Sequence, residues 1–213
     1  MARPWKGSRA LLQKVPSLYI LARGCRSLPS RDQVKITLRC GRKANRWQYN
    51  IGDYANRDIR FFDLLDEHFL KTHPIDLTRI HCTGSSNGGG FTSALAQERE
   101  TIFASFAPAL TSHTGREEAQ KMNLPNIPNI PILHIIGEKE GGFLKQKELV
   151  LNIVDTRNGQ PLGPWRNQAR TRFFSSPLGD FVWYVHRRGH RWRSHDTQIV
   201  IDFFKTYPKK NTW

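Results

Sequence analysis

The 213-residue sequence predicts an α/β fold, a three-layer sandwich in which helices cover a mostly parallel sheet. Two observations favour this fold class. Short apolar runs of strand length alternate along the chain with longer segments of helical periodicity, as in parallel α/β proteins. The length and an ordinary apolar content of 38% also suit one domain with a sizeable core. No apolar run is long enough for a transmembrane helix.

The first expected elements are two short strands, a helix and a third strand. Residues 17–23 (SLYILAR) form a compact apolar run, and residues 34–39 (VKITLR) alternate apolar and polar side chains. Residues 58–73 predict an amphipathic helix whose acidic side chains are exposed. Its apolar face comprises Ile59, Phe62, Leu65, Phe69 and Leu70. Residues 79–83 (RIHCT) read as the next strand.

The second half of the chain continues the alternation. A helix is expected over residues 87–99, where the helical pattern emerges from a run of glycines. Buried strands are expected at 102–110, 131–137 and 181–186, with a proline-punctuated loop at 124–131. A final helix over residues 195–207 directs four apolar side chains inward, namely Ile199, Ile201, Phe203 and Phe204.

Charge is distributed unevenly along the chain, whose formal net charge is +15. Residues 1–47 carry 12 lysines and arginines against one acid, and residues 160–213 carry 10 against three. The middle segment is slightly acidic. Basic ends of this kind attract nucleic acid, anionic surfaces or acidic substrates, although a solvated basic surface is the simpler interpretation. No zinc-finger, RNA-binding or helix-turn-helix signature accompanies the charge, so nucleic acid is not an expected partner.

Three cysteines, Cys25, Cys40 and Cys82, allow one disulfide at most and form no CxxC pair. Cys82 lies in an apolar run and is expected to be a small buried residue. The first thirty residues have a basic start and an apolar middle. That middle is interrupted by Lys14 and Pro16, so no convincing signal peptide is predicted.

The stretch Gly84-Ser85-Ser86-Asn87-Gly88 fits the pattern G-x-S-x-G between an expected strand and an expected helix. A serine at the apex of so sharp a turn adopts strained backbone geometry, and its close neighbours must lack a Cβ atom. Its hydroxyl then stands clear of the sheet at a helix N-terminus. The pattern predicts Ser86 as a nucleophile and the Asn87 N–H as an oxyanion donor. A phosphate cradle is the weaker interpretation, because GxxxxGK[ST] and GxGxxG are absent.

A nucleophilic serine of this kind needs an acid and a histidine base. Both follow the serine in the chain, the acid first and the histidine after it. Five histidines follow the loop: His113, His134, His186, His190 and His195. His190 is favoured, because it lies in a loop between the last strand and the last helix. His134 is expected in the core, His186 at a strand end and His195 at the start of the helix. Glu140 is the favoured acid, with Glu138 and Asp155 as alternatives.

The motifs together resemble the polyhydroxybutyrate depolymerase and feruloyl esterase group of α/β-hydrolases. TRIHCTGSSNGGGFTSALA is similar to that group's TG-x-SNGG turn, and PILHIIGEKE to its acid-bearing segment. VHRRGHRW before IVIDFF is similar to the segment with the catalytic histidine, and RWQYNIGDYANRDIRFFDLL to the Trp-then-Asp approach to a helix. The likeness spans about Trp47 to Tyr207. Asp is usual where Glu140 stands, and the N-terminal part is shortened or divergent.

The resemblance implies an α/β-hydrolase core over residues 47–213, preceded by a basic, divergent segment over residues 1–46. It implies a cofactor-independent serine ester hydrolase with Ser86, His190 and Glu140 as its triad, acting outside the cytoplasm on phenolic or aliphatic acyl esters. YILARGCRSLP is similar to the loop that supplies a second oxyanion N–H, which would come from Gly24 or Cys25. The competing hypothesis is a catalytically impaired relative that binds polyanions through its basic ends. No metal and no membrane partner are expected, and a small or polymeric ester is the expected substrate.

Overall fold

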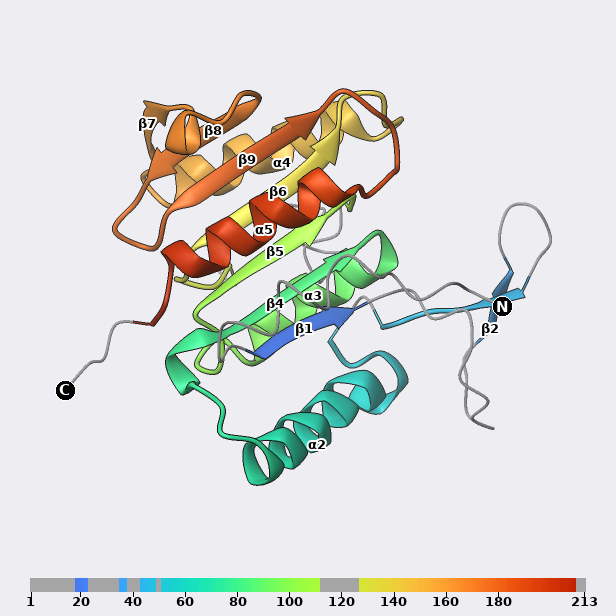
Figure 1. Cartoon of the computed structure of the whole chain (residues 1–213). Coiled ribbons are helices and arrows are strands. Elements are labelled where there is room, and N and C mark those ends of the chain that lie inside the picture. Colours follow the sequence, from blue (N-terminus) through green and yellow to red (C-terminus); the bar gives the residue numbers. More distant parts are fainter. Residues whose placement is uncertain (1–17, 23–34, 38–42, 49–50, 112–126, 210–213) are drawn as a thin grey trace.

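A seven-stranded sheet organises the chain in the computed structural model, which describes residues 18–22, 35–37, 43–48, 51–111 and 127–209 (Figure 1). The strand order is β1-β4-β5-β6-β9-β8-β7. The five parallel strands are β1 (Leu18–Ala22), β4 (Ile80–Ser85), β5 (Ser105–Ala109), β6 (Ile132–Gly137) and β9 (Phe181–His186). The two antiparallel strands at one edge are β7 (Gln160–Gly163) and β8 (Thr171–Ser175).

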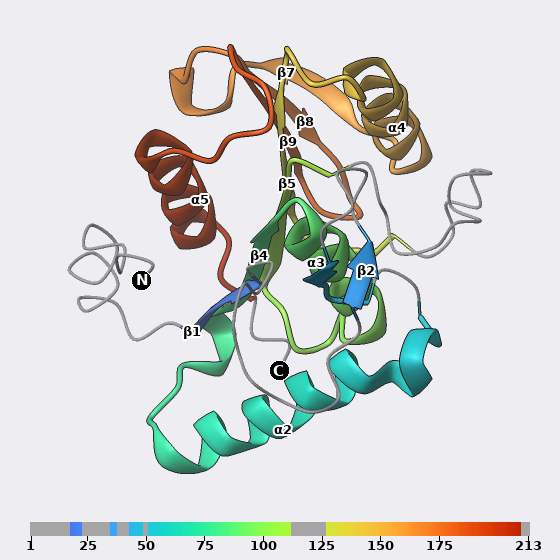
Figure 2. The same cartoon turned by 90° about the vertical axis from the view of Figure 1, so that its right-hand side faces the viewer.

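Helices cover both faces of the sheet, which makes the fold the three-layer sandwich that the sequence predicts (Figure 2). The helices are α2 (Arg57–Thr72), α3 (Asn87–Glu98), α4 (Phe143–Thr156) and α5 (Ser194–Thr206). Helices α3 and α4 lie on one face and α5 on the other, while α2 lies beyond the β1 edge (Figures 1 and 2). Parallel neighbours need crossover connections, and a helix supplies these with an apolar face for the sheet.

The core is divided into two apolar clusters by the sheet. One cluster packs α2, α3 and α4 against the sheet through residues such as Phe62, Phe91 and Val150. The other packs α5 against the opposite face, with Phe203 fully buried. Strands buried on both faces read as continuous apolar runs, which is why residues 132–136 and 181–184 stand out in the sequence. Within the described residues, no helix combines the length and apolarity needed to cross a membrane.

Helix α2 confirms the expected amphipathic segment, but two of its residues lie on a different face from the one predicted. Ile59 and Phe62 are buried as predicted, whereas Leu70 is 42% exposed. Asp58, expected in solvent with the other acids, is buried. Its carboxylate accepts a hydrogen bond from the Gln48 N–H at 2.7 Å, and the Gln48 side chain accepts one from the Asp58 N–H at 3.0 Å. Tertiary pairing therefore draws this carboxylate inward.

The N-terminal strands divide between two structures. The strand expected at 17–23 is β1, which pairs with β4 in parallel from Leu18–Ile80 to Ala22–Gly84. The strand expected at 34–39 is the three-residue β2 (Lys35–Thr37), which, among the described residues, pairs with β3 (Lys43–Asn45) in a separate two-stranded sheet. The boundary between residues 46 and 47 stays a prediction.

Four strands and helices of the structure were not expected from the sequence: β3, α4, β7 and β8. Helix α4 begins at Phe143, three residues after Glu140. Strand β7 (QPLG) is exposed along its whole length and contains Pro161, so neither apolar alternation nor composition indicates a strand. Its pairing with β8 is antiparallel and irregular at Pro161 and Gly163. An edge position tolerates both features.

Candidate active site

The turn between β4 and α3 carries Ser86 in strained backbone geometry. Its φ of 58° and ψ of −120° lie in a region that non-glycine residues rarely adopt. The Ser86 N–H donates to the Ala109 carbonyl of the neighbouring β5 at 2.9 Å, and the Ser86 carbonyl accepts from the Gly89 and Gly90 amides. The turn is therefore held by hydrogen bonds on both sides, and the strain at its apex is stabilised by the surrounding fold.

Two glycines make this turn possible by different means. A Cβ atom on Gly84 would lie 2.3 Å from the Gly88 carbonyl oxygen, so β4 and α3 approach each other too closely for any side chain there. A Cβ atom on Gly89 would lie 2.6 Å from the Ala109 carbonyl oxygen, so the first turn of α3 packs directly on β5. Steric exclusion thus explains the glycine-rich composition of the motif.

Asn87 is the first residue of α3, so its backbone N–H has no acceptor within the helix. Its side chain performs a role that the sequence did not reveal. The side-chain oxygen accepts from the Trp47 N–H at 2.7 Å, and the side-chain amide donates to the Trp47 carbonyl at 3.1 Å. The Trp47 ring stacks on Phe91 of α3, with centroids 5.0 Å apart. These contacts hold the segment that contains Trp47, which precedes α2, next to the turn between β4 and α3.

The side chains of His190 and Glu140 are in hydrogen-bonding contact, although 50 residues separate them. His190 Nδ1 lies 3.1 Å from Glu140 Oε2. The other carboxylate oxygen of Glu140 accepts from the Gly137 N–H at 3.1 Å. The Glu140 side chain is only 8% exposed, while that of His190 is 54% exposed. The Glu140 carboxylate is therefore held in place by two contacts, one of them to the imidazole. The other imidazole nitrogen, Nε2, is available to other groups.

Backbone hydrogen bonds join the loops that carry this pair. The Glu138 N–H donates to the His186 carbonyl at 2.9 Å, and the Lys139 N–H donates to the Arg188 carbonyl at 3.0 Å. A Cβ atom on Gly137 would lie 2.1 Å from the Arg188 carbonyl oxygen, so only glycine lets the loops cross here. The parallel pairing of β6 and β9 thus continues past their ends and determines where Glu140 meets His190.

The alternative acids occupy other environments. Glu138 forms an ion pair with Arg170. Asp155 lies near the C-terminal end of α4, whereas Glu140 lies in the loop that precedes this helix. Neither carboxylate hydrogen-bonds a histidine within the described residues.

The other histidines also match their expected places where the structure describes them. His134 is buried in β6, 3.3 Å from the side-chain oxygen of Gln146, and burial lowers its pKa to about 4. His186 ends β9, is buried and accepts from the Arg188 N–H, and burial lowers its pKa. His195 is the second residue of α5. His113 lies outside the described residues.

Ser86, Glu140 and His190 lie at the same edge of the sheet, because each follows the carboxyl end of a parallel strand. No hydrogen bond joins the Ser86 hydroxyl to His190 in this structure. Catalytic hydrogen bonds are often long in ligand-free enzymes and tighten in the substrate complex. β1 ends with Ala22 paired to Gly84, at the same edge. Gly24 and Cys25 lie outside the described residues, so their oxyanion role stays a prediction.

Cys82 is fully buried in β4, as expected, and burial raises the pKa of its thiol to about 12. Cys25 and Cys40 lie outside the described residues. In the part of the chain that is described, no three His, Cys, Asp or Glu side chains cluster as metal ligands would.

The sheet order, the strained turn after β4 and the acid and histidine loops after β6 and β9 together define an α/β-hydrolase fold. Comparison with solved structures agrees. A carboxylesterase from Bacillus cereus is 14% identical, with a TM-score of 0.54 over 89% of this chain and 88% of that chain. A carboxylesterase from Mesorhizobium loti is also 14% identical, with a TM-score of 0.54 over 90% of each chain.

A glucuronoyl esterase from Solibacter usitatus is 10% identical, with a TM-score of 0.55 over 89% of this chain and 74% of that chain. A thermostable esterase is 18% identical over 72% of this chain, which spans 37% of that chain's length, with a TM-score of 0.49. No protein-family model and no curated protein sequence matches. At such low identities, the likenesses with TM-scores above 0.5 show the shared fold.

Proposed function

We propose that this protein is a serine carboxylic-ester hydrolase that works through an acyl-enzyme, with Ser86 as nucleophile, His190 as base and Glu140 as the orienting acid. The observation that carries the proposal is the hydrogen bond between His190 Nδ1 and Glu140 at the sheet edge where Ser86 occupies its strained turn. Nucleophilic ester hydrolysis requires three groups of these types, and this chain order is the one typical of the α/β-hydrolase fold. The esterases that share the fold add support.

Acylation begins with attack of the Ser86 hydroxyl on the ester carbonyl. His190 takes the serine proton at Nε2, because its Nδ1 faces Glu140. The buried carboxylate stabilises the resulting imidazolium and holds the ring in the tautomer that leaves Nε2 free to accept. His190 then protonates the alkoxide leaving group, and the acyl group stays on Ser86.

The Asn87 N–H is the oxyanion donor in this proposal, because it begins α3 and has no intrahelical acceptor. The Asn87 side chain is engaged with Trp47, which holds the residue and its amide in one orientation. A second N–H would come from Gly24 or Cys25, after β1. Water activated by His190 then hydrolyses the acyl-enzyme, with the same groups acting in reverse order.

The resemblance to feruloyl esterases and polyhydroxybutyrate depolymerases extends the proposal to phenolic or short aliphatic acyl esters. Methyl ferulate, p-nitrophenyl butyrate and a hydroxybutyrate oligomer are the three substrates that separate these possibilities. Turnover of only one of them would identify the acyl class, and turnover of none would reject this part of the proposal.

A fluorophosphonate probe tests the nucleophile directly. It should label the wild-type protein and leave Ser86→Ala unlabelled, because the probe reacts only with an activated serine. Ser85→Ala is the matched control, since it removes the adjacent hydroxyl at the end of β4 and should still be labelled. Equal labelling of wild type and Ser86→Ala would reject Ser86, and the absence of labelling in wild type would reject the hydrolase itself.

A further inference from the structure

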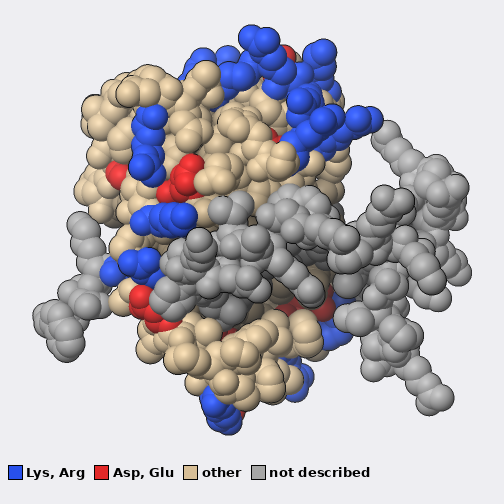
Figure 3. Space-filling view, in the orientation of Figure 1, with Lys and Arg blue, Asp and Glu red and all other residues tan. Residues whose placement is uncertain are grey.

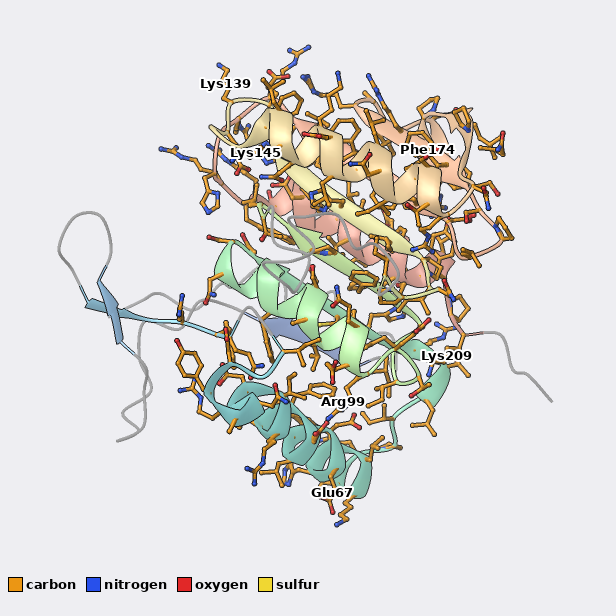
Figure 4. The ribbon with its side chains drawn as sticks, turned by 180° about the vertical axis from the view of Figure 1, so that it is seen from behind. Glu67, Arg99, Lys139, Lys145, Phe174 and Lys209 are labelled. Atoms are coloured by element: carbon orange, nitrogen blue, oxygen red, sulfur yellow. The ribbon has the colours of Figure 1, made fainter. Side chains whose placement is uncertain are left out.

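Five basic residues lie on the loops that bring His190 and Glu140 together. We name this group the cationic collar; its members are Lys139, Arg187, Arg188, Arg191 and Arg193, and all are exposed. Figure 3 shows lysine and arginine side chains gathered over the carboxyl ends of β6 and β9. In Figure 4, Lys139 and Lys145 lie at this end of the sheet, and Lys209 lies toward the other.

The acidic side chains of these two loops, which the structure describes in full, form no ion pairs with the collar residues. Glu138 forms its ion pair with Arg170, and Glu140 hydrogen-bonds His190. The next carboxylate, Asp196, is buried in the first turn of α5, where it accepts from the Arg193 N–H at 2.6 Å. Within the described residues, no collar side chain forms an ion pair. Positive charge is therefore concentrated where a substrate would reach His190.

Backbone contacts keep the collar in place relative to His190. Lys139 donates its N–H to the Arg188 carbonyl at 3.0 Å, and the Arg191 N–H donates to the Gly189 carbonyl at 2.7 Å. The two loops that carry the collar residues are thus joined to each other next to His190. Charges grouped on one face around a site raise the local concentration of oppositely charged ligands.

We infer that the protein prefers esters that carry a negative charge, such as a carboxylate, close to the scissile bond. This inference rests on the proposed esterase function and specifies its substrate class. The collar attracts the anionic ester and stabilises its complex, while Ser86 and His190 perform the same chemistry on either kind of ester. A basic surface unrelated to the site would produce no such preference.

The test compares kcat/KM for esters of matched length, each corrected for its rate of spontaneous hydrolysis. In the first pair, mono-p-nitrophenyl adipate carries the charge in its acyl part, and p-nitrophenyl heptanoate is its neutral counterpart. The acetate of 5-hydroxy-2-nitrobenzoate against p-nitrophenyl acetate places the charge in the alcohol part. At low salt the wild-type protein should favour the anionic member of at least one pair by about tenfold, and 0.5 M NaCl should abolish most of that preference.

The double variant Arg188→Gln/Arg191→Gln should lower the anionic-to-neutral ratio about tenfold, or about threefold for each charge removed. Arg60→Gln is the control, because Arg60 is exposed on α2, far from the collar. Thermal unfolding establishes that each variant is folded.

Equal kcat/KM for neutral and anionic esters in the wild type, or an equal fall of the ratio in Arg60→Gln, would overturn the inference while leaving the esterase proposal intact. A preference confined to one pair would support it and locate the charge in the acyl or the alcohol part. Failure of the wild type to hydrolyse any ester faster than Ser86→Ala would instead remove the proposed function on which the inference rests.

Discussion

At the scale of single residues, position and not residue type distinguishes Glu140 from its neighbour Glu138. The Glu140 carboxylate is nearly buried, and one of its oxygens accepts from the Gly137 N–H while the other faces His190. The Glu138 carboxylate, two residues earlier, is more exposed and faces Arg170. The feruloyl esterase group that the sequence resembles usually has Asp at this position. The longer Glu140 side chain also brings a carboxylate oxygen within hydrogen-bonding distance of the imidazole.

Glu140→Gln should lower kcat by about 10³–10⁴-fold, because a neutral amide neither stabilises the imidazolium nor maintains the required tautomer. Glu138→Gln is the matched control and should change kcat by about threefold or less, because its ion pair is partly exposed. Steady-state hydrolysis of p-nitrophenyl butyrate by both variants provides the measurement. A larger loss in Glu138→Gln would transfer the acid role to that residue.

At the scale of elements, the turn from β4 to α3 depends on how closely the strand and the helix approach each other. Gly84 contacts the Gly88 carbonyl, and Gly89 contacts the β5 backbone, so the turn has little room to adjust. Overpacking in a rigid region displaces backbone and not only side chains. The geometry of Ser86 should therefore be sensitive to a single added methyl group.

Gly84→Ala should lower the free energy of unfolding by about 2–3 kcal/mol, because the new methyl group would overlap the Gly88 carbonyl and Thr92 Oγ1. Gly141→Ala, where nothing lies within 4 Å of the added Cβ, should stay within about 0.5 kcal/mol of wild type. Urea unfolding followed by circular dichroism measures both. Equal midpoints for the two variants would show that the turn is less tightly packed than described.

At the scale of the whole molecule, two of the buried histidines lie on opposite faces of the sheet. His81 stacks on Phe204 of α5 and lies 2.9 Å from the Ser105 hydroxyl, whereas His134 faces Gln146 of α4. Burial lowers the pKa of His81 to about 3 and that of His134 to about 4. Both side chains are therefore neutral in the folded protein at pH values where the unfolded chain is protonated.

The stability of the protein should decrease as the pH falls below about 6.5, because the unfolded state then binds protons that the folded state excludes. At pH 5 the expected loss is about 2 kcal/mol for each of the two histidines. His81→Phe should make the slope of unfolding free energy against pH shallower, whereas His68→Gln, at an exposed position, should leave it unchanged. Unfolding by urea between pH 5 and 7.5 measures the slopes, and identical slopes in all three proteins would contradict the expectation.

Local patterns in the sequence predicted the alternating elements, the serine turn and the loop positions of His190 and Glu140. These features depend on periodicity, glycine placement and turn chemistry within a few residues. Elements with weak local signals were missed. Strand β7 is exposed and contains Pro161, and it forms only because β8 pairs with it at the sheet edge.

The sequence by itself determined the fold class and named the three residues proposed as the triad, since short segments carry that information. Only the tertiary structure decided that the Glu140 carboxylate contacts His190 while that of Glu138 pairs with Arg170, and that the Asn87 side chain holds Trp47. The contact between Glu140 and His190 depends on the order of strands in the sheet. Pairing of β6 with β9 brings together residues 50 positions apart, and no local pattern encodes such a contact.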